Sequence, residues 1–354
     1  MKTEEEISRN LELLSNNSLK EEITEWLVYI KFPTIQRTTY DTYFSTAERL
    51  IFPYIGNVPA LEVSAIDIQK LLNTLKDKGL AFATTKKARL ILNEFYNYKV
   101  LRGEIAHSPL EILQPAKRAA YESSQGKEVR ACTDRVIVFT PEEIEMMRDA
   151  YFAYKDNSKG AHKQAAVYFL LLNTGLRRGE ICGLLNRDID MRKRILWVRR
   201  TVKNVKKRVN GYAVPGKELI VGTPKTINSI RSVPLNFVAL EMIKQLRKDL
   251  YLGMDKPLLC NNHGDFTIPD TLSQRFRMFQ IAAGIAEPKP LHTLRHTFAT
   301  NLINGITQPD GRVKHLSVKQ VADILGHKTS TITEQYYVKR DFTKLKGITD
   351  GFEF

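Results

Sequence analysis

The sequence is poor in cysteine and in long apolar runs, and each shortage excludes a class of protein. It has only 3 cysteines in 354 residues and no CxxC pair, so neither a disulfide framework nor a cysteine zinc site is expected. A reduced, cytoplasmic chain is the simplest interpretation. The longest apolar run, Ala165–Leu172, is far shorter than the roughly 20 residues needed to cross a bilayer. The acidic start, MKTEEEISRN, lacks the apolar segment of a signal peptide.

The overall composition is ordinary for a chain with a buried core. Hydrophobic residues make up 43% and charged residues 26%, which excludes a wholly disordered or collagen-like chain. A length of 354 residues predicts two or three domains, since domains usually span about 100–200 residues.

Acidic residues are missing from one stretch, and this locates the net charge of +15. Residues 151–250 contain 21 basic and 7 acidic side chains, and residues 192–217 contain no acidic one. Lys and Arg opposite phosphates gain by releasing condensed counterions, so a polyanion-binding surface is one interpretation. A solvated basic surface is the other, and a membrane surface fits less well because the stretch has strand character. The candidate DNA contacts are Arg199, Arg200, Lys203, Lys206, Lys207, Arg208 and Arg231.

The N-terminal part, after a short polar head at 1–17, predicts a compact helical domain over 18–112. Apolar residues recur at helical spacing over 19–31, 36–51, 65–78 and 82–102. Pro53 is expected to end the second helix, and Ser64 to cap the third. Residues 113–135 are polar without periodicity and predict a linker, partly disordered without a partner.

The remainder predicts a second domain over 136–340, mainly helical with a small antiparallel sheet, that is, an α+β fold. Thr140-Pro141-Glu142-Glu143 is a capping box that starts a helix. Branched and aromatic residues indicate strands at 195–202, 218–222 and 230–235, with a long loop at 204–217. Residues 307–316 predict a surface loop, and 341–354 a tail that docks on a neighbouring protomer. The other helices are expected at 162–173, from Leu176, and at 236–250, 268–283, 292–304, 317–325 and 329–337.

Four segments together favour one kind of chemistry. They are TGLRRGE at 174–180, PKT at 224–226 with SIR at 229–231, HTLRH at 292–296, and LGH at 325–327 with a tyrosine nine residues further on. Each alone has an ordinary explanation, and the two histidines of HTLRH also have a metal-like spacing. However, no acidic or cysteine ligand flanks them and no HExxH is present, so no metal site is predicted. Arginine forks, a lysine, histidines and a tyrosine suit phosphoryl transfer on a backbone phosphate without a metal or other cofactor.

These motifs resemble the tyrosine recombinase, or phage integrase, family, over Thr140 to about Arg340. The resemblance implies that Arg177 and Arg295 clamp the scissile phosphate, and that Lys225 is the general acid. It also implies that His292, the histidine of the H-x-x-R box, is catalytic, and that His327 contacts the phosphate. Tyr336 matches the nucleophile that forms a 3′-phosphotyrosyl link, favoured over Tyr337 by its spacing from His327. The supporting residues by the same resemblance are Glu180, which orients Arg177, and His296.

The resemblance further implies a C-shaped clamp on double-stranded DNA, a homotetramer in synapsis, and an excisionase or DNA-bending protein as optional accessory partners. The enlarged loop before 218–222 resembles integrases of conjugative transposons and favours integration or excision of a mobile element. A Xer-like resolvase of chromosome or plasmid dimers, a relaxing topoisomerase and a non-catalytic DNA-binding regulator remain as alternatives.

Overall fold

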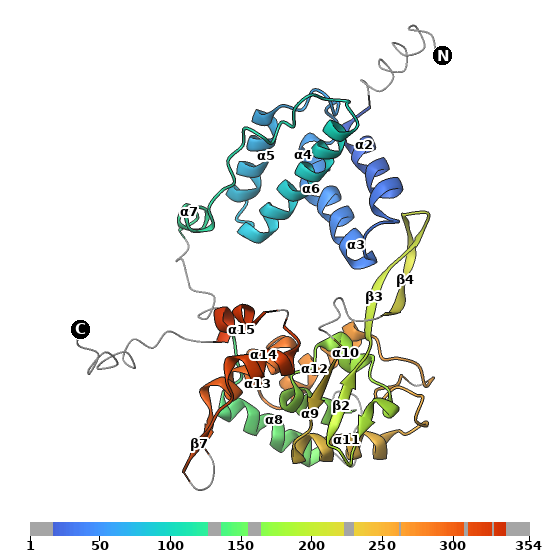
Figure 1. Ribbon diagram of the computed structural model, residues 1–354, viewed down its shortest axis with the longest axis vertical. Coiled ribbons are helices and arrows are strands. Elements are labelled where there is room, and N and C mark those ends of the chain that lie inside the picture. Colours follow the sequence, from blue (N-terminus) through green and yellow to red (C-terminus); the bar gives the residue numbers. More distant parts are fainter. Residues whose placement is uncertain are drawn as a thin grey trace, which may run out of the picture. The chain divides into compact units, whose positions relative to one another are not determined.

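The structure is a computed structural model that describes residues 17–126, 136–154, 164–222, 230–261, 263–307, 311–327 and 329–337. The chain divides into two compact units (Figure 1). One unit comprises residues 1–129 and 205–218, and the other comprises residues 130–204 and 219–354. Residues 205–218, the tip of a β-hairpin, therefore belong to the N-terminal unit, which the sequence did not predict.

The N-terminal unit is helical, and all four predicted helical segments are confirmed. Pro53 is the exception to the expected boundaries, because it does not end a helix. It lies in the first turn of a short helix, where a missing N–H leaves no hydrogen bond unmade. Ser64 does cap its helix, with Asp67 closing the capping box. The elements are α2 (Leu19–Glu25), η1 (Trp26–Lys31), α3 (Arg37–Thr46), η2 (Ala47–Ile51), α4 (Phe52–Ile55), α5 (Ala65–Asp77) and α6 (Phe82–Leu101).

One hydrophobic core holds these helices together. Leu27, Tyr40, Ile68 and Phe95 come from four different elements and are all fully or almost fully buried. The ring of Trp26 meets that of Phe95 edge to face, with centroids 5.8 Å apart. The helical periodicity in the sequence thus arises because the residues that repeat are those that face this core.

The segment predicted as a linker is folded over its first half. Residues 118–123 form α7 (Arg118–Ser123), whose Tyr121 is buried and donates its hydroxyl to the Leu80 carbonyl at 2.9 Å. Gln125 Nε2 donates to the Lys76 carbonyl at 2.8 Å. A single turn held by one aromatic side chain has no periodic pattern, so the sequence did not reveal it. Cys132 and the rest of 127–135 lie outside the described residues.

The expected loop at 204–217 is wrong, because strands run through it. β3 (Thr201–Val209) and β4 (Tyr212–Gly222) form a separate two-stranded ribbon. Its turn has Asn210 at φ 48° and Gly211 at φ 86°, the mirror-image turn that matches strand twist. Pro215 and Gly216 lie within β4, and Gly216 adopts φ 100°. A two-stranded ribbon tolerates a proline and a kink because it has free edges.

The C-terminal unit surrounds α9, which is buried almost throughout and packs against α11 and α13. A three-stranded antiparallel sheet of order β1-β2-β5 adds to the core, with Leu196 opposite Val233. The predicted capping box at Thr140 is confirmed, since Glu143 Oε2 accepts from the Thr140 N–H at 2.8 Å. The elements are α8 (Pro141–Tyr154), α9 (Ala166–Thr174), α10 (Arg178–Cys182), η5 (Asn186–Asp188), β1 (Ile189–Asp190), β2 (Ile195–Val198), β5 (Arg231–Pro234), α11 (Phe237–Asp249), α12 (Pro269–Ala282) and α13 (His292–Asn304).

The chain after α13 forms a small ribbon and two further helices. β6 (Ile306–Thr307) and β7 (Val313–Lys314) pair where a loop was predicted, and residues 308–310 between them lie outside the described residues. They are followed by α14 (Val318–Leu325) and α15 (Ser330–Tyr337). In the described ranges, no helix has both the length and the apolar character needed to span a bilayer. The tail at 341–354 is outside the described residues.

Candidate active site

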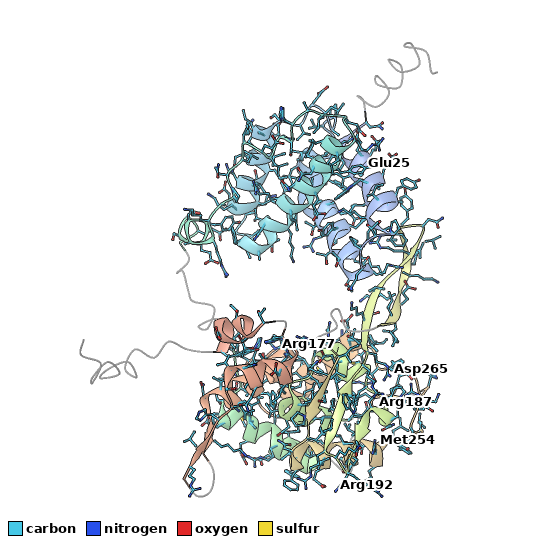
Figure 2. All side chains as sticks on the ribbon, in the orientation of Figure 1. Glu25, Arg177, Arg187, Arg192, Met254 and Asp265 are labelled. Atoms are coloured by element: carbon cyan, nitrogen blue, oxygen red, sulfur yellow. The ribbon has the colours of Figure 1, made fainter. Side chains whose placement is uncertain are left out.

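The first arginine of the site lies where α9 passes into α10 (Figure 2). Gly175 ends α9 at φ 62°, and a Cβ there would approach Phe298 Cδ1 to 2.5 Å, so a side chain is excluded. Arg177 occupies the N-cap position of α10. Its backbone N–H donates to Glu180 Oε2 at 2.8 Å, and its guanidinium donates to Glu180 Oε1 at 2.9 Å. The Arg177 side chain is 37% exposed, so Glu180 holds it in place while part of it remains accessible to solvent.

The second arginine, Arg295, lies in the first turns of α13 and is 2% exposed. Its guanidinium donates to the carbonyls of Gly175 at 2.6 Å and Leu325 at 2.8 Å. Burial, and then the charge of Arg177, lower the pKa of Arg295 to about 9. Arg295 is a buried cation that is bound mainly by carbonyl dipoles and lies near a second cation. A bound anion would therefore stabilise its charged form.

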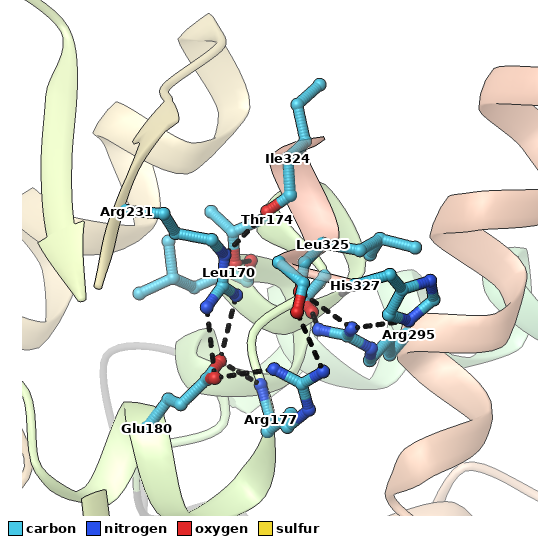
Figure 3. Close-up of polar contacts among 11 residues, drawn as sticks. Leu170, Thr174, Arg177, Glu180, Arg231, Arg295, Ile324, Leu325 and His327 are labelled. Carbon is cyan, nitrogen blue, oxygen red and sulfur yellow. Dashed lines mark hydrogen bonds and ion pairs between the residues drawn. The ribbon is translucent and has the colours of Figure 1, made fainter. Parts of the chain in front are cut away.

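The end of α14 gathers three arginines. The consecutive carbonyls at 324–326 accept from Arg231 at 2.7 Å, from Arg295 at 2.8 Å and, at a long 3.4 Å, from Arg177. Figure 3 shows these guanidiniums converging on the turn that carries His327. The C-terminus of a helix carries a partial negative charge that favours cations. This turn thereby holds positive charges close together before any anion binds.

His327 is neutral in this arrangement, and its tautomer follows from its partners. Nε2 lies 3.1 Å from the guanidinium of Arg295, and Nδ1 lies 2.8 Å from the hydroxyl of Thr333 in α15. Since a guanidinium can only donate, Nε2 must accept, and Nδ1 carries the proton. Burial, followed by the charge of Arg295, lowers the pKa of His327 to about 4.

The remaining two histidines of the site lie on the same helix and meet edge to face. His292 and His296 have ring centroids 4.6 Å apart. Surrounding protein atoms, then His296, lower the pKa of His292, although its side chain keeps an exposed face. His296 Nδ1 lies 2.8 Å from the hydroxyl of Tyr337, which is 5% exposed. Among the described residues, no group of histidine, cysteine and acidic side chains is arranged to hold a metal ion.

The structure brings most of the predicted site residues together. Arg177, Arg295, His327 and Glu180 are joined directly or through the turn after α14. Tyr336 lies in α15, but its side chain is not described, and Lys225 lies outside the described residues. Sequence reasoning missed Thr333 and Tyr337 as partners of histidines. No spacing rule could have identified them, because both partners lie in α15, whereas His296 lies in α13 and His327 follows α14.

Two of the residues predicted to contact DNA are instead buried in ion pairs within the protein. Arg208 has a side chain only 1% exposed and pairs with Asp41 in the N-terminal unit. Arg231 has a side chain 6% exposed and pairs with Glu180. Neither side chain has the free surface that a phosphate contact needs, so the expectation does not fit these two. A basic run gives no sign of which members are buried.

The other predicted DNA contacts differ in how free they are. Arg199 is exposed over the Trp197 ring, and Arg200 pairs with Asp188. Lys206 and Lys207 are exposed and Lys203 is partly exposed. Arg199, Lys206 and Lys207 are therefore the exposed members of the set.

The charge balance of the site favours an anion. Arg177, Arg231 and Arg295 surround one carboxylate, that of Glu180. Burial alone would raise the pKa of Glu180, but the hydrogen bonds and charge of Arg231, and then the charge of Arg177, hold it at about 2. The carboxylate is thus ionised, and the cluster carries two surplus positive charges, which suits a phosphodiester.

Comparisons with known proteins agree with this geometry. The sequence profile of the "Phage integrase family" matches residues 138–344, and that of the "Phage integrase, N-terminal SAM-like domain" matches residues 18–76. A "Tyrosine recombinase XerC-like" protein of Caldanaerobacter subterraneus subsp. tengcongensis is 28% identical over 78% of this chain and 67% of its own length. A "Tyrosine recombinase XerC" of Chlorobaculum tepidum is 24% identical over 77% of this chain and 74% of its own.

Solved structures share the fold. The Tn1549 transposon integrase in complex with a circular intermediate DNA covers 95% of this chain and 100% of its own, with a TM-score of 0.69 and 18% identity. A lambda integrase tetramer bound to a Holliday junction covers 96% and 85%, with a TM-score of 0.62 and 20% identity. The helical unit, the α+β unit and the arginine cluster define a tyrosine recombinase. The chain belongs to the phage integrase family.

Proposed function

We propose that this chain is a site-specific DNA recombinase that cleaves and rejoins double-stranded DNA through a 3′-phosphotyrosyl intermediate, and that it integrates or excises a mobile element. The observation that carries the proposal is the convergence of Arg177 and Arg295 with His327 on the turn after α14. Guanidinium forks match the non-bridging oxygens of a phosphodiester, and they stabilise the charge that develops there during transfer. We infer a cytoplasmic location from such a substrate.

The proposed reaction exchanges one phosphodiester for another. The hydroxyl oxygen of Tyr336 forms a bond to the scissile phosphorus, and the bond from phosphorus to the 5′ oxygen breaks. Lys225 gives its proton to the leaving 5′ oxygen, and a neutral imidazole, His292 or His327, takes the proton of Tyr336. Attack by a 5′ hydroxyl of another strand reverses these steps and releases the tyrosine. No net bond energy is lost, so no nucleotide cofactor is needed.

The environment of Tyr337 supports Tyr336 as the nucleophile. Tyr337 is buried, and its hydroxyl is engaged by His296. A hydroxyl that is engaged inside the protein is poorly placed to attack a phosphate, and this favours Tyr336 over Tyr337 as the nucleophile.

The experiment traps the covalent intermediate. Nicked suicide duplexes are prepared from the DNA that flanks the gene and from a randomised duplex library, and adducts that survive SDS are sequenced. We expect a 3′-phosphotyrosyl adduct with the wild type and with Tyr337→Phe, and none with Tyr336→Phe. An adduct that persists in Tyr336→Phe and vanishes in Tyr337→Phe would reverse the assignment. If the wild type binds DNA but forms no adduct at all, the chain is a regulator.

The assembly is proposed as a homotetramer on two DNA sites, with the tail at 341–354 docked on a neighbouring protomer. Support comes from the solved lambda integrase tetramer on a Holliday junction, which shares the fold. Removing residues 342–354 is then expected to weaken synapsis more than single-site binding. Equal loss in both measurements would refute the docking role. Excisionase or DNA-bending partners belong to the proposal only as additions to be tested with the purified chain.

A resolvase of chromosome or plasmid dimers is a second candidate, favoured by the names of the sequence relatives. The two candidates differ in their substrates. Recombination between two directly repeated copies of one site would favour the resolvase. Recombination between unlike sites that flank the gene would favour the integrase.

A further inference from the structure

Arg231 uses its whole guanidinium inside the site. It is the first residue of β5, and its side chain is 6% exposed. One nitrogen donates to Glu180 Oε1 at 3.0 Å and another to Glu180 Oε2 at 2.9 Å, in a bidentate fork. The third, Nε, donates to the Ile324 carbonyl at 2.7 Å. Figure 3 shows Arg231 and Arg177 reaching Glu180 from two sides.

Glu180 is fully occupied by these two arginines. Besides the fork from Arg231, it accepts from the backbone N–H and from the guanidinium of Arg177. Removing one member of a buried ion pair leaves an uncompensated charge that must find another partner. For Glu180 that partner is Arg177, which is already 2.9 Å away.

The charge count gives Arg231 a consequence for the phosphate. With Arg231 present, Arg177, Arg231 and Arg295 exceed Glu180 by two positive charges. Without Arg231 the surplus falls to one, and the attraction of Glu180 acts on Arg177 alone. A guanidinium tied to a carboxylate in a protein interior is a weaker clamp for a phosphate, because the anion must compete with a close counter-ion.

The backbone beside Arg231 is shaped to admit it. Gly326, at φ 66°, lies against this side chain, and a Cβ there would approach Arg231 Cδ to 2.9 Å. The same turn leads directly into His327 and presents its Gly326 carbonyl to Arg177. Arg231 therefore binds both the Glu180 carboxylate and the turn at 324–326, and Arg177 contacts the same two groups.

We propose that Arg231 is a positioning residue. It offsets the negative charge of Glu180, so that the positive charge of Arg177 remains available to bind the scissile phosphate. This inference rests on the proposed recombinase function. It replaces a direct DNA contact by Arg231 with an action through Arg177. It also separates Arg231 from a merely structural ion pair, because the effect depends on the charge of the substrate.

The test compares first-turnover adduct formation on two nicked duplexes, one with a normal scissile phosphate and one with a methylphosphonate, which lacks the negative charge. Arg231→Gln is expected to slow the normal reaction roughly 10- to 100-fold, by analogy with the loss of a residue that orients a metal-binding side chain. On the methylphosphonate its defect is expected to be several-fold smaller. The double variant Glu180→Gln/Arg231→Gln, which removes both charges, is expected to recover part of the rate.

Arg187→Gln is the matched control, because Arg187 lies on the same unit apart from Arg177 (Figure 2) and forms an exposed pair with Asp255 at 2.6 Å. Full speed in Arg231→Gln, or an equal loss on both duplexes, would overturn the proposal. If Arg231→Gln does not fold, the double variant and Arg231→Lys, which keeps the charge without the fork, decide in its place. Failure of the wild type to form any adduct would instead refute the proposed function.

Discussion

Nε of Arg208 lies 2.7 Å from Oδ1 of Asp41, and this pair fastens the tip of the β3–β4 ribbon within the N-terminal unit. The guanidinium lies over the rings of both Tyr40 and Phe44, 4.7 and 4.8 Å from their centroids. It also donates to the Gly211 carbonyl at 2.8 Å, which accepts from the Tyr40 hydroxyl as well. The ribbon tip is thus part of a hydrophobic and ionic core.

Arg208→Gln is expected to destabilise the N-terminal unit by about 3 kcal/mol, because breaking a buried pair leaves the carboxylate of Asp41 without its partner. The measurement is the free energy of unfolding by urea. Lys207→Gln, an exposed neighbour on the same strand, is the control and should change the free energy by no more than about 0.5 kcal/mol. Equal effects of the two substitutions would show that the pair does not hold the ribbon.

Lys206 and Lys207 are exposed on the same ribbon, and we expect them to contact DNA phosphates. Each phosphate contact contributes about 0.9 to the slope of log K against log salt. The double variant Lys206→Gln/Lys207→Gln should therefore flatten that slope by up to about 2, without loss of folding stability. The binding constant is measured by titration at several salt concentrations, with Lys244→Gln, a surface lysine on α11, as the control. An unchanged slope would mean that these lysines are only a solvated surface.

The sequence predicted the α+β class and most of the helices of both units. Those features follow from periodicity and from short-range spacing, as in the capping boxes at Ser64 and Thr140. The conformation of the ribbon tip was predicted wrongly because it depends on contacts between positions far apart in sequence. Asp41 and Arg208 show this, since neither carries a local sign of the other.

The sequence predicted which residue types belong to the site, but not the hydrogen bonds and ion pairs between them. Arg231 looked like one more member of a basic run, although it is buried against Glu180. Periodicity and charge runs report exposure only on average, and pairing across helices decides which cations remain free. The role of Glu180 beside Arg177 was implied by resemblance, and the two bonds between them agree with it.

Tyr337→Phe should leave adduct formation within a few-fold of the wild type while lowering stability by about 1 kcal/mol, the net value of one hydrogen bond. The hydroxyl lost is the one that pairs with His296 at 2.8 Å. First-turnover adduct yield and the free energy of unfolding are measured on the same preparation. The matched variant Tyr336→Phe should show the opposite pattern, with full stability and no adduct. Loss of adduct in both variants would mean that the His296–Tyr337 bond is needed to place α15.

His327 should also make the stability of the DNA-free protein depend on pH. Its pKa of about 4 lies below the ordinary histidine value, because of burial and then the charge of Arg295. The unfolded chain therefore binds more protons than the folded one between about pH 6.5 and pH 4, so the free energy of unfolding falls as the pH falls through that window. Replacing His327 with glutamine, which keeps hydrogen-bonding capacity but does not titrate, should flatten part of this slope.

The same group gives a test of anion binding. A phosphodiester held by Arg177 and Arg295 would favour the imidazolium form, so the pKa of His327 should rise when DNA binds. The imidazole resonances are followed by NMR against pH in the Tyr336→Phe variant, with and without a cognate duplex. If the pKa does not move on DNA binding, or if DNA that lacks the site raises it as much as the cognate duplex does, His327 does not contact the scissile phosphate.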